Sequence, residues 1–338
     1  MLSKRLASLT CAALLAGAVS GLSAAAASAT TLNGAGSTLV APIEAEWAAA
    51  WGNATGNQVN YQAVGSGQGL LDAGTNQVDF GGSDAPLSAS STACNGCLQI
   101  PWALSATGVS FNLGGIHRLH LTGPVIAEIY LGQIKRWNDK RITSLNKGVH
   151  LPNEAITPIH RSDGSGDSYA FTDYLSRVSS TFRRHVGTAT KPTGWVGPGA
   201  PKNAGMVTAE ESTPGSIAYI AVSFLIAHSL PAAAIKNNAG NYEVPNLKNI
   251  TAAAAVVHSI PGNDEIHIVN PPRSARAAYV ISTFTYAIIP ASRPNAAALK
   301  SFIAFAFSRS GQAFGPRLDF APLPSNIVGA DNAALGRF

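Results

Sequence analysis

The sequence predicts an α/β fold, because short β-like runs alternate with alanine-rich helical runs along the chain. Polar segments that contain glycine follow several of the expected strands, at the positions where open α/β sheets bind ligands. The chain has 338 residues, which is long enough for a large hydrophobic core and for two lobes. Apolar residues make up 46% of it and charged residues only 12%. Gly and Pro are spread throughout, as in a globular chain rich in turns.

The N-terminus has the features of a signal peptide. Lys4 and Arg5 form a positive region, residues 6–22 are almost all apolar or small, and the small residues that a signal peptidase requires end at Ala29. We therefore expect an exported protein, cleaved after Ala29, that is periplasmic or extracellular. A membrane anchor is the weaker alternative because the run is short and rich in Ala and Gly. A lipid-modified Cys11 is also disfavoured, because the residues before it are a poor lipobox.

The exported chain carries a mild positive charge. The formal charge of +5 includes Lys4 and Arg5, so removal of the leader leaves about +3. The remaining basic residues are scattered, and even the densest group, residues 183–185, does not resemble a basic stripe with interleaved aromatic residues. We therefore expect no nucleic-acid partner. The positive balance suits an anionic ligand without proving one.

Two cysteines remain after the leader. Cys94 and Cys97 flank Asn95 and Gly96, a turn-forming pair that can bring the two sulfur atoms together. In an oxidising compartment a small disulfide loop is the expected state. Free thiols remain an alternative, and a redox site would require a thioredoxin-like unit.

Helices are expected over residues 39–51, 168–178, 232–234, 252–257 and 295–307, and strands over residues 59–64, 77–80 and 155–160. In the first helix, Trp47 and Trp51 are spaced i, i+4 and share one face. The strand at 59–64 alternates in polarity, and the helix at 168–178 has aromatic and aliphatic residues for one face. The runs at 232–234 and 252–257 are alanine-rich.

Four polar segments stand beside these elements, at residues 34–38, 65–67, 83–84 and 161–167. Each offers hydroxyl groups and backbone N–H groups next to glycine, so an oxyanion could approach closely. Three of them precede an expected helix start, where free N–H groups and the helix dipole bind anions. Taken singly, each segment is more often an ordinary turn. A nucleotide fold is disfavoured, because there is no P-loop motif and no GxGxxG placed in a βαβ unit.

Seven segments occur in the order typical of one known family. They are LNGAGST at 32–38, VNYQAVGS at 59–66, DFGGSDAPLS at 79–88, IYLGQIKRWND at 129–139, RSDGSG at 161–166, TPGSIAY at 213–219 and APLP at 321–324. In these segments the chain resembles the periplasmic phosphate-binding proteins of the phosphate-specific ABC import system. The resemblance covers nearly the whole chain after the leader.

The resemblance implies a two-lobed periplasmic binding protein of type II, a Venus flytrap with two hinge crossings. Lobe 1 would comprise residues 30–112 and 277–338, and lobe 2 residues 113–276. Such lobes close around phosphate, and the membrane permease of the importer recognises the closed form. We accordingly expect a monomer that binds and delivers phosphate, with no cofactor, no metal and no enzymatic activity.

By the same resemblance, phosphate is held by hydrogen bonds alone. The implied ligands are Ser37, Thr38, Leu39, Ser66 and Asp84 from lobe 1 and Arg161, Ser165, Gly166 and Asp167 from lobe 2. Asp163 would orient Arg161 for a charge-assisted bond.

Asp84 would decide the specificity. A carboxylate that faces an anion is favourable only if the anion carries a proton to donate, as phosphate does at neutral pH and sulfate does not. The alternative is that Asp84 only caps a turn or a helix.

Asp167 departs from the threonine of many family members. We expect its carboxylate to point to solvent at the second helical position, where it complements the dipole, while its N–H contacts phosphate. The alternative is that the carboxylate accepts a second proton from the ligand.

Two other functions remain open. Residues 166–168 and 264–267 mimic the GDS and DxxH blocks of a serine esterase class, with Ser168 and His267 as the reacting pair. The GDS block lies mid-chain rather than near the N-terminus, which disfavours the esterase hypothesis. A scaffold or adhesin that keeps the fold without transport is the second alternative. His117 and His120 have no acidic partners nearby, so a metal site is disfavoured.

Overall fold

The computed structural model describes residues 29–88 and 91–337. The predicted signal peptide falls on residues 1–28 and so lies outside the described residues, except for Ala29. The strands are β1 Thr31–Gly36, β2 Gln58–Ala63, β3 Phe80–Ser83, β4 Leu98–Phe111, β5 His120–Leu121, β6 Thr157–Arg161, β7 Gly199–Ala200, β8 Ser216–Ala221, β9 Ala234–Lys236, β10 Tyr242–Glu243 and β11 Ser282–Ile289. The helices are α1 Ala41–Thr55, α2 Ser66–Gly74, α3 Gly123–Tyr130, α4 Lys140–Thr143, α5 Gly166–Val178, α6 Ser180–His185, α7 Lys202–Glu211, α8 Val222–Ala227, α9 Leu247–Ala254, α10 Ala296–Phe307, α11 Arg309–Gln312, the 3₁₀ helix Gly315–Leu318 and α12 Ser325–Leu335.

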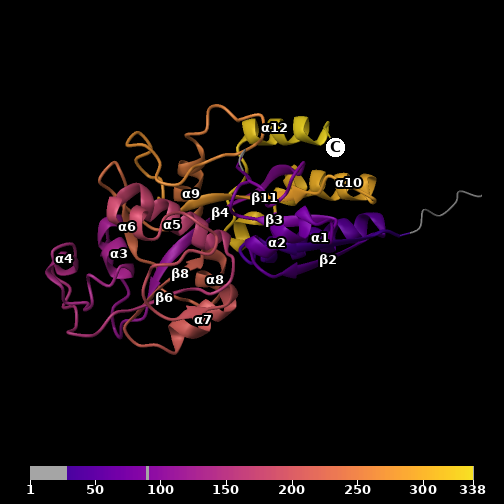
Figure 1. Cartoon of the computed structure of the whole chain (residues 1–338). Coiled ribbons are helices and arrows are strands. Elements are labelled where there is room, and N and C mark those ends of the chain that lie inside the picture. Colours follow the sequence, from indigo (N-terminus) through magenta and orange to yellow (C-terminus); the bar gives the residue numbers. More distant parts are fainter. Residues whose placement is uncertain (1–28, 89–90, 338) are drawn as a thin grey trace, which may run out of the picture.

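One long strand joins two halves of the main sheet, whose order is β2-β1-β3-β11-β4-β8-β6-β7. Residues 98–106 of β4 pair with β11, whereas residues 107–111 pair with β8. We call β2, β1, β3, β11 and residues 98–106 the first half, and residues 107–111, β8, β6 and β7 the second half. In Figure 1 the first half lies on the right with α1, α2 and α10, and the second half lies on the left with α3 and α5–α8.

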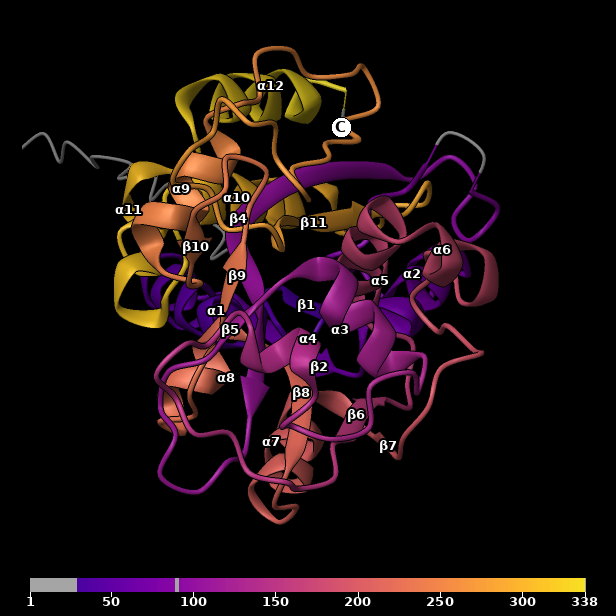
Figure 2. The same cartoon turned by 90° about the vertical axis from the view of Figure 1, so that its left-hand side faces the viewer.

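The parallel strands of each half end toward the same region. β1 is parallel to both β2 and β3, and β6 is parallel to β8 and β7. Helices α1 and α2 pack on the strands of the first half, and α5 and α7 pack on those of the second. Figure 2 shows β8, β6 and β7 with α7 beside them. Loops that leave the carboxyl ends of these strands therefore meet between the halves.

Each half has its own aromatic cluster. In the first half the ring centroid of Trp102 lies 5.3 Å from that of Trp47 and 5.7 Å from that of Phe80. In the second half Phe171 stacks on Tyr219 with 4.4 Å between the centroids. All five side chains are buried in the main hydrophobic core, to which each half contributes its own group of packed aromatic rings.

Most of the expected elements are present, with shifted ends. The helix expected at 295–307 is α10, and the strand expected at 77–80 begins only at Phe80 because residues 77–79 form a turn. The helix expected at 232–234 is wrong. This run follows Pro231 and pairs in extended form, with the N–H of Ala233 donating to Val109 and that of Ala234 to Leu119. Alanine content indicates a helix only where no strand edge competes for the backbone.

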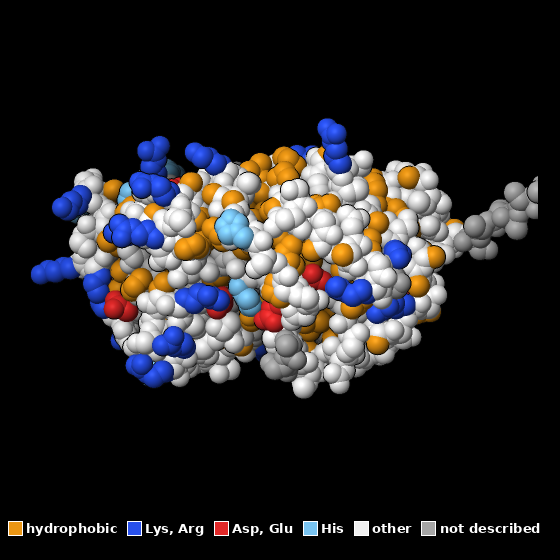
Figure 3. Space-filling view, turned by 90° about the horizontal axis from the view of Figure 1, so that it is seen from above, with side chains coloured by type: hydrophobic (Ala, Val, Ile, Leu, Met, Phe, Trp, Pro, Cys, Tyr) orange, Lys and Arg blue, Asp and Glu red, His pale blue; other side chains and the backbone are white. Residues whose placement is uncertain are grey.

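Basic side chains outnumber acidic ones on the face shown in Figure 3. On the face in Figure 3 the Lys and Arg side chains are spread over both ends, more densely at the left, and Asp and Glu are few. Within residues 29–88 and 91–337, no helix combines the length and the apolar character needed to cross a bilayer. The same part of the chain holds no group of three or more His, Cys, Asp or Glu side chains placed to bind a metal ion.

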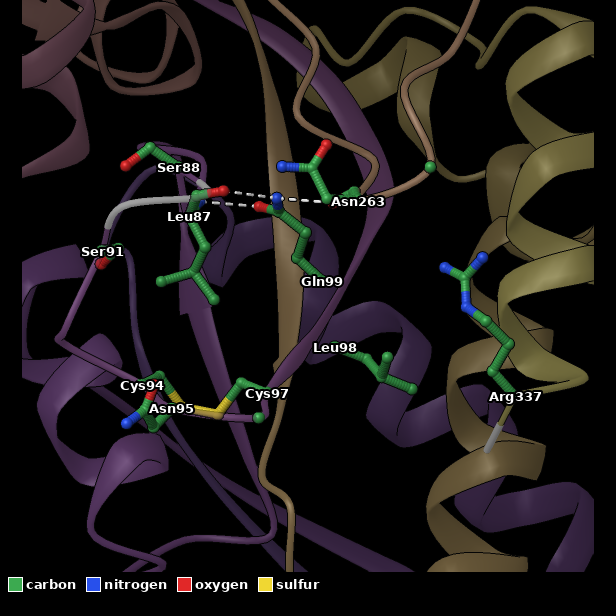
Figure 4. A pocket seen from close by; sticks show the side chains of 12 residues that line it. Leu87, Ser88, Ser91, Cys94, Asn95, Cys97, Leu98, Gln99, Asn263 and Arg337 are labelled. Atoms are coloured by element: carbon green, nitrogen blue, oxygen red, sulfur yellow. Dashed lines mark hydrogen bonds between the residues drawn. A yellow bond between two sulfur atoms is a disulfide. The ribbon is translucent and has the colours of Figure 1, made fainter.

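The Cys94–Cys97 disulfide closes a loop beside a cavity of about 350 Å³ (Figure 4). Gln99 holds the segment before this loop in place. Its Nε2 donates to the carbonyls of Leu87 and Asn263 at 2.8 Å each. Its Oε1 also accepts the N–H of Leu87 at 2.8 Å. The disulfide loop is thus tied to the segment that leads into β11.

Replacing both Cys94 and Cys97 with Ser should lower the free energy of unfolding by roughly 2 kcal/mol, the loop-entropy value for so short a ring. Urea denaturation of the wild type with and without a reducing agent gives the same quantity independently. The reductant should leave the double variant unchanged. Equal stability of variant and wild type would show that the ring does not constrain the unfolded chain.

Candidate functional site

The predicted loops converge between the two halves of the sheet. Ser37 follows β1, Ser66 begins α2 after β2, and Asp84 follows β3, all in the first half. Arg161 ends β6 and Ser165 caps α5 in the second half. All five side chains are at most 3% exposed. The site is therefore assembled from strand ends that lie far apart in the sequence.

Asp84 is a carboxylate enclosed by hydroxyl groups. The hydroxyl of Ser37 donates to it and lies 2.7 Å from both carboxylate oxygens. The hydroxyl of Ser66 donates to Oδ2 at 3.2 Å, and the same oxygen of Ser66 accepts the N–H of Asp84. Burial raises the pKa of Asp84 above its usual range, and the nearby Asp167 raises it further.

Arg161 is held by two carboxylates. Its Nε donates to Asp163 Oδ1 at 2.8 Å and its Nη2 to Oδ2 at 2.5 Å, so the pair is bidentate. Its Nη1 donates to Asp167 Oδ2 at 3.1 Å. Burial lowers the pKa of the guanidinium, but the two carboxylates outweigh burial and hold that pKa above its ordinary value. Arg161 is therefore charged and fixed in direction.

The expected solvent-facing carboxylate of Asp167 is wrong. The side chain is only 1% exposed, and its Oδ1 accepts the hydroxyl of Thr107 at 2.7 Å. Its Oδ2 accepts from Arg161 and, at 2.8 Å, from Nδ2 of Asn203. The second helical position of α5 faces β4 and α7 rather than water, because the start of α5 lies between the two halves. Burial raises the pKa of Asp167 and these three donors oppose that effect.

The start of α5 lies directly against the first half. A Cβ added to Gly166 would overlap Asp84 and come within 2.6 Å of Ser66 Oγ. The N–H of Gly67 donates to the carbonyl of Gly164 at 2.9 Å, which is a main-chain bond between the halves. The structure therefore has its two halves in contact around Asp84. Only glycine fits where α5 begins.

Thr38 and Leu39 continue the first loop into α1. The N–H of Leu39 donates to Ser37 Oγ at 3.0 Å, and the Oγ1 of Thr38 accepts from Nδ2 of Asn203 at 2.9 Å. Both residues are buried. This turn is held in part by Ser37 and in part by a helix of the other half.

Sequence reasoning missed three residues that build the site. Asn203 and Thr107 bind the Asp167 carboxylate, and the hydroxyl of Tyr219 accepts the N–H of Arg161 at 2.9 Å. All three are fully buried. Only Tyr219 carried a signal, since it ends one of the segments typical of the family. Asn203 and Thr107 lie in stretches without a recognisable pattern.

The esterase arrangement is not assembled. The hydroxyl of Ser168 lies 2.6 Å from that of Tyr219 and is fully buried. His267 instead lies 3.0 Å from Glu265 Oε1 on an exposed loop. A serine nucleophile needs a hydrogen-bonded base, and here the neighbour of Ser168 is a phenol. The sequence fragments therefore do not form a triad.

Chemically, the site offers hydroxyl donors, one guanidinium and the N-terminus of α5 around a buried carboxylate. Donors of this kind hold an oxyanion. When it is ionised, the Asp84 carboxylate can only accept, and in that state it requires an oxyanion that still carries a proton.

The comparisons with known proteins agree with this chemistry. The PBP superfamily domain matches residues 23–310. A phosphate-binding protein PstS of Xylella fastidiosa is 34% identical over 302 residues, which cover 88% of this chain and 82% of that protein. One of Pasteurella multocida is 35% identical over 303 residues, covering 88% of each chain. The fold is also that of a high affinity periplasmic phosphate-binding protein solved with phosphate, at a TM-score of 0.70 and 19% identity, over 91% of this chain and 94% of that one.

The likeness gives this chain the two-lobed fold of the periplasmic binding proteins. By sequence the chain belongs to the PBP superfamily and, within it, to the phosphate-binding PstS proteins.

Replacing Asp84 with Asn should raise the melting temperature of the ligand-free protein at pH 8. The pKa of Asp84 is higher in the folded than in the unfolded state, so its contribution to stability is present near pH 4 and is lost as the pH rises. Asn never ionises, so the gain over wild type should vanish near pH 4. Asp79→Asn, which changes a half-buried carboxylate outside the site, is the control. A gain that is equal at both pH values would contradict this account.

Proposed function

We propose that this protein binds inorganic phosphate outside the cytoplasm and delivers it to the membrane permease of an ABC importer, without catalysing a reaction. The observation that carries the proposal is the buried Asp84 carboxylate, which is enclosed by hydroxyl donors and lies against the start of α5. The relatives named phosphate-binding protein support the same ligand.

Asp84 supports phosphate over sulfate. Phosphate at neutral pH keeps a proton that it can donate to the carboxylate, whereas sulfate has none and would be repelled. An unpaired buried charge costs several kcal/mol in rough terms, so the difference in affinity is large.

The proposed ligands are those that the sequence indicated. The hydroxyl and main-chain groups of Ser37, Thr38, Leu39 and Ser66 would serve from the first half, with Asp84 as acceptor, and Arg161, Ser165, Gly166 and Asp167 would serve from the second. Asp163 supports the set by fixing Arg161.

For Asp167 we propose that only the main-chain N–H contacts phosphate. Both carboxylate oxygens already accept from Thr107, Arg161 and Asn203, so the side chain needs no ligand proton. If the carboxylate did accept one, binding would favour the monobasic ion and tighten as the pH falls from 8 to 5.

The proposed lobes are residues 30–112 with 277–338, and residues 113–276. The change of partner within β4 supports one crossing, about five residues before the proposed boundary at 112, because residues 107–111 already pair with β8. The return of the chain into β11 supports the second crossing. Two crossings form a hinge, and phosphate that touches both lobes shifts the population toward the closed form. A monomer in this closed form would be the species that the permease recognises.

A scaffold or adhesin without a ligand is the second candidate. It is disfavoured because a scaffold would have no need for a costly buried group of charges such as Asp84, Arg161 and Asp167.

Calorimetry of the purified, phosphate-free protein tests the proposal. Phosphate should bind with micromolar affinity or better, and sulfate should give no heat. Comparable binding of sulfate would contradict the role of Asp84, and no heat with either anion would favour a scaffold. A series from pH 5 to pH 8 tests Asp167, because marked tightening at pH 5 would contradict contact through its N–H alone.

Replacing Gly166 with Ala should weaken phosphate binding by about 10- to 100-fold, because the added methyl group overlaps Asp84 and keeps the halves apart. The control is Gly114→Ala, where a Cβ meets no atom within 4 Å. Both variants should keep the wild-type melting temperature in the absence of phosphate to within a few degrees. Wild-type affinity in Gly166→Ala would mean that α5 does not approach Asp84 in the bound form.

A further inference from the structure

Asn203 lies in the first turn of α7 and is completely buried. Its Nδ2 donates to Thr38 Oγ1 at 2.9 Å and to Asp167 Oδ2 at 2.8 Å. Its Oδ1 accepts the N–H of Ala221 at 2.9 Å. The carboxamide thus uses both of its donors and an acceptor on groups that surround the site.

The orientation of this carboxamide is fixed by chemistry. The N–H of Ala221 can only donate, so it must face the oxygen of the amide. Asp167, when ionised, can only accept, so it must face the NH₂ group. A flipped Asn203 would lose both bonds.

This orientation determines what Thr38 can do. The Thr38 oxygen accepts from Asn203, which leaves the hydroxyl proton of Thr38 for another acceptor. Within residues 29–88 and 91–337, Asn203 is the only hydrogen-bond partner recorded for that hydroxyl. Its proton is therefore available to a bound anion.

The same bond joins the two halves of the sheet. Thr38 follows β1 in the first half, whereas α7 packs on β6 and β8 in the second. The two residues are 165 positions apart in sequence. The bond can therefore form only when the halves are in contact.

We propose that Asn203 is a positioning residue for phosphate. As the lobes close, it turns the hydroxyl of Thr38 toward the anion and keeps the carboxylate of Asp167 engaged with protein donors. Asn203 does not touch the anion itself. This inference rests on the proposed binding of phosphate.

Two variants of Asn203 separate positioning from packing. Asn203→Ala removes both donors, and phosphate affinity should fall about 10-fold or more, the value for a lost hydrogen bond to a charged group. Asn203→Asp keeps the shape and the acceptor for Ala221 but places an oxygen against both Thr38 and Asp167. A packing role would survive that change, whereas a positioning role would not.

Thr38→Val, made alone and together with Asn203→Ala, forms a double-mutant cycle. If Asn203 acts through Thr38, the second substitution should cost clearly less than the first. The control is Asn249→Ala in α9, which removes a 4%-exposed amide that donates to Glu243 and to the carbonyl of Val244. It should lower the melting temperature and leave phosphate affinity unchanged.

The affinity of Asn203→Asp should also depend on pH. The new carboxylate lies against Asp167, which is faced by Asp84, Arg161, Asp163 and Tyr219 in both proteins. The ratio of variant to wild-type affinity therefore isolates the new pair. That ratio should be lowest at pH 8 and recover in part at pH 5, where one proton can be shared between the two carboxylates.

The outcomes distinguish this inference from the function on which it rests. A wild type that binds no phosphate would overturn the proposed function. A wild type that binds phosphate together with Asn203 variants of equal affinity would overturn the positioning role alone. Losses that are additive with Thr38→Val and independent of pH would also overturn it, since they would indicate packing.

Discussion

The burial of the Asp84 carboxylate between the two halves of the sheet is the constraint on which the site depends. Together with Asp163 and Asp167 it opposes the single guanidinium of Arg161, so the closed site has more negative than positive side chains. Hydroxyl groups and the N-terminus of α5 compensate in part, because they supply donors without adding a full charge. A ligand that carries a proton can donate it to Asp84, whereas a fully deprotonated anion would face that carboxylate with repulsion alone.

The proposed closing motion has to preserve the contacts around Asp84. The donors sit on loops that leave parallel strands, and these strands are packed against the aromatic groups around Trp102 and Tyr219. β4 runs unbroken through both halves, so the proposed hinge would have to bend where its partner changes from β11 to β8. Two hydrogen bonds join the halves directly beside the site. One links the main chains of Gly67 and Gly164, and the other links Asn203 to Thr38. In the proposed closing motion these bonds would form next to the bound ligand, which would couple closure to binding.

The sequence predicted the loops better than it predicted their surroundings. Ser66 and Asp84 could be found because glycine and hydroxyl residues follow recognisable strands, and that pattern is local. Asn203 could not, because its partners Thr38 and Asp167 come from distant positions and no spacing marks them. The predicted orientation of the Asp167 carboxylate was wrong for the same reason. The position of a residue in a helix does not reveal which side of that helix the other half of the sheet will cover.

A raised pKa does not by itself mark a binding site in this chain. Burial raises the pKa of Glu44 and Glu210 to about 8 and that of Asp331 to about 9, yet each has at least one carboxyl oxygen without a hydrogen-bond partner among the described residues. These three carboxyls take up protons on folding, so their contribution to stability is greatest near pH 4 and is lost as the pH rises through 8 to 9. Asp84 shares the burial but differs in its neighbours, because hydroxyl donors enclose it and the start of a helix from the other half faces it. The arrangement of donors around a carboxylate, and not its pKa, therefore separates the site from the core.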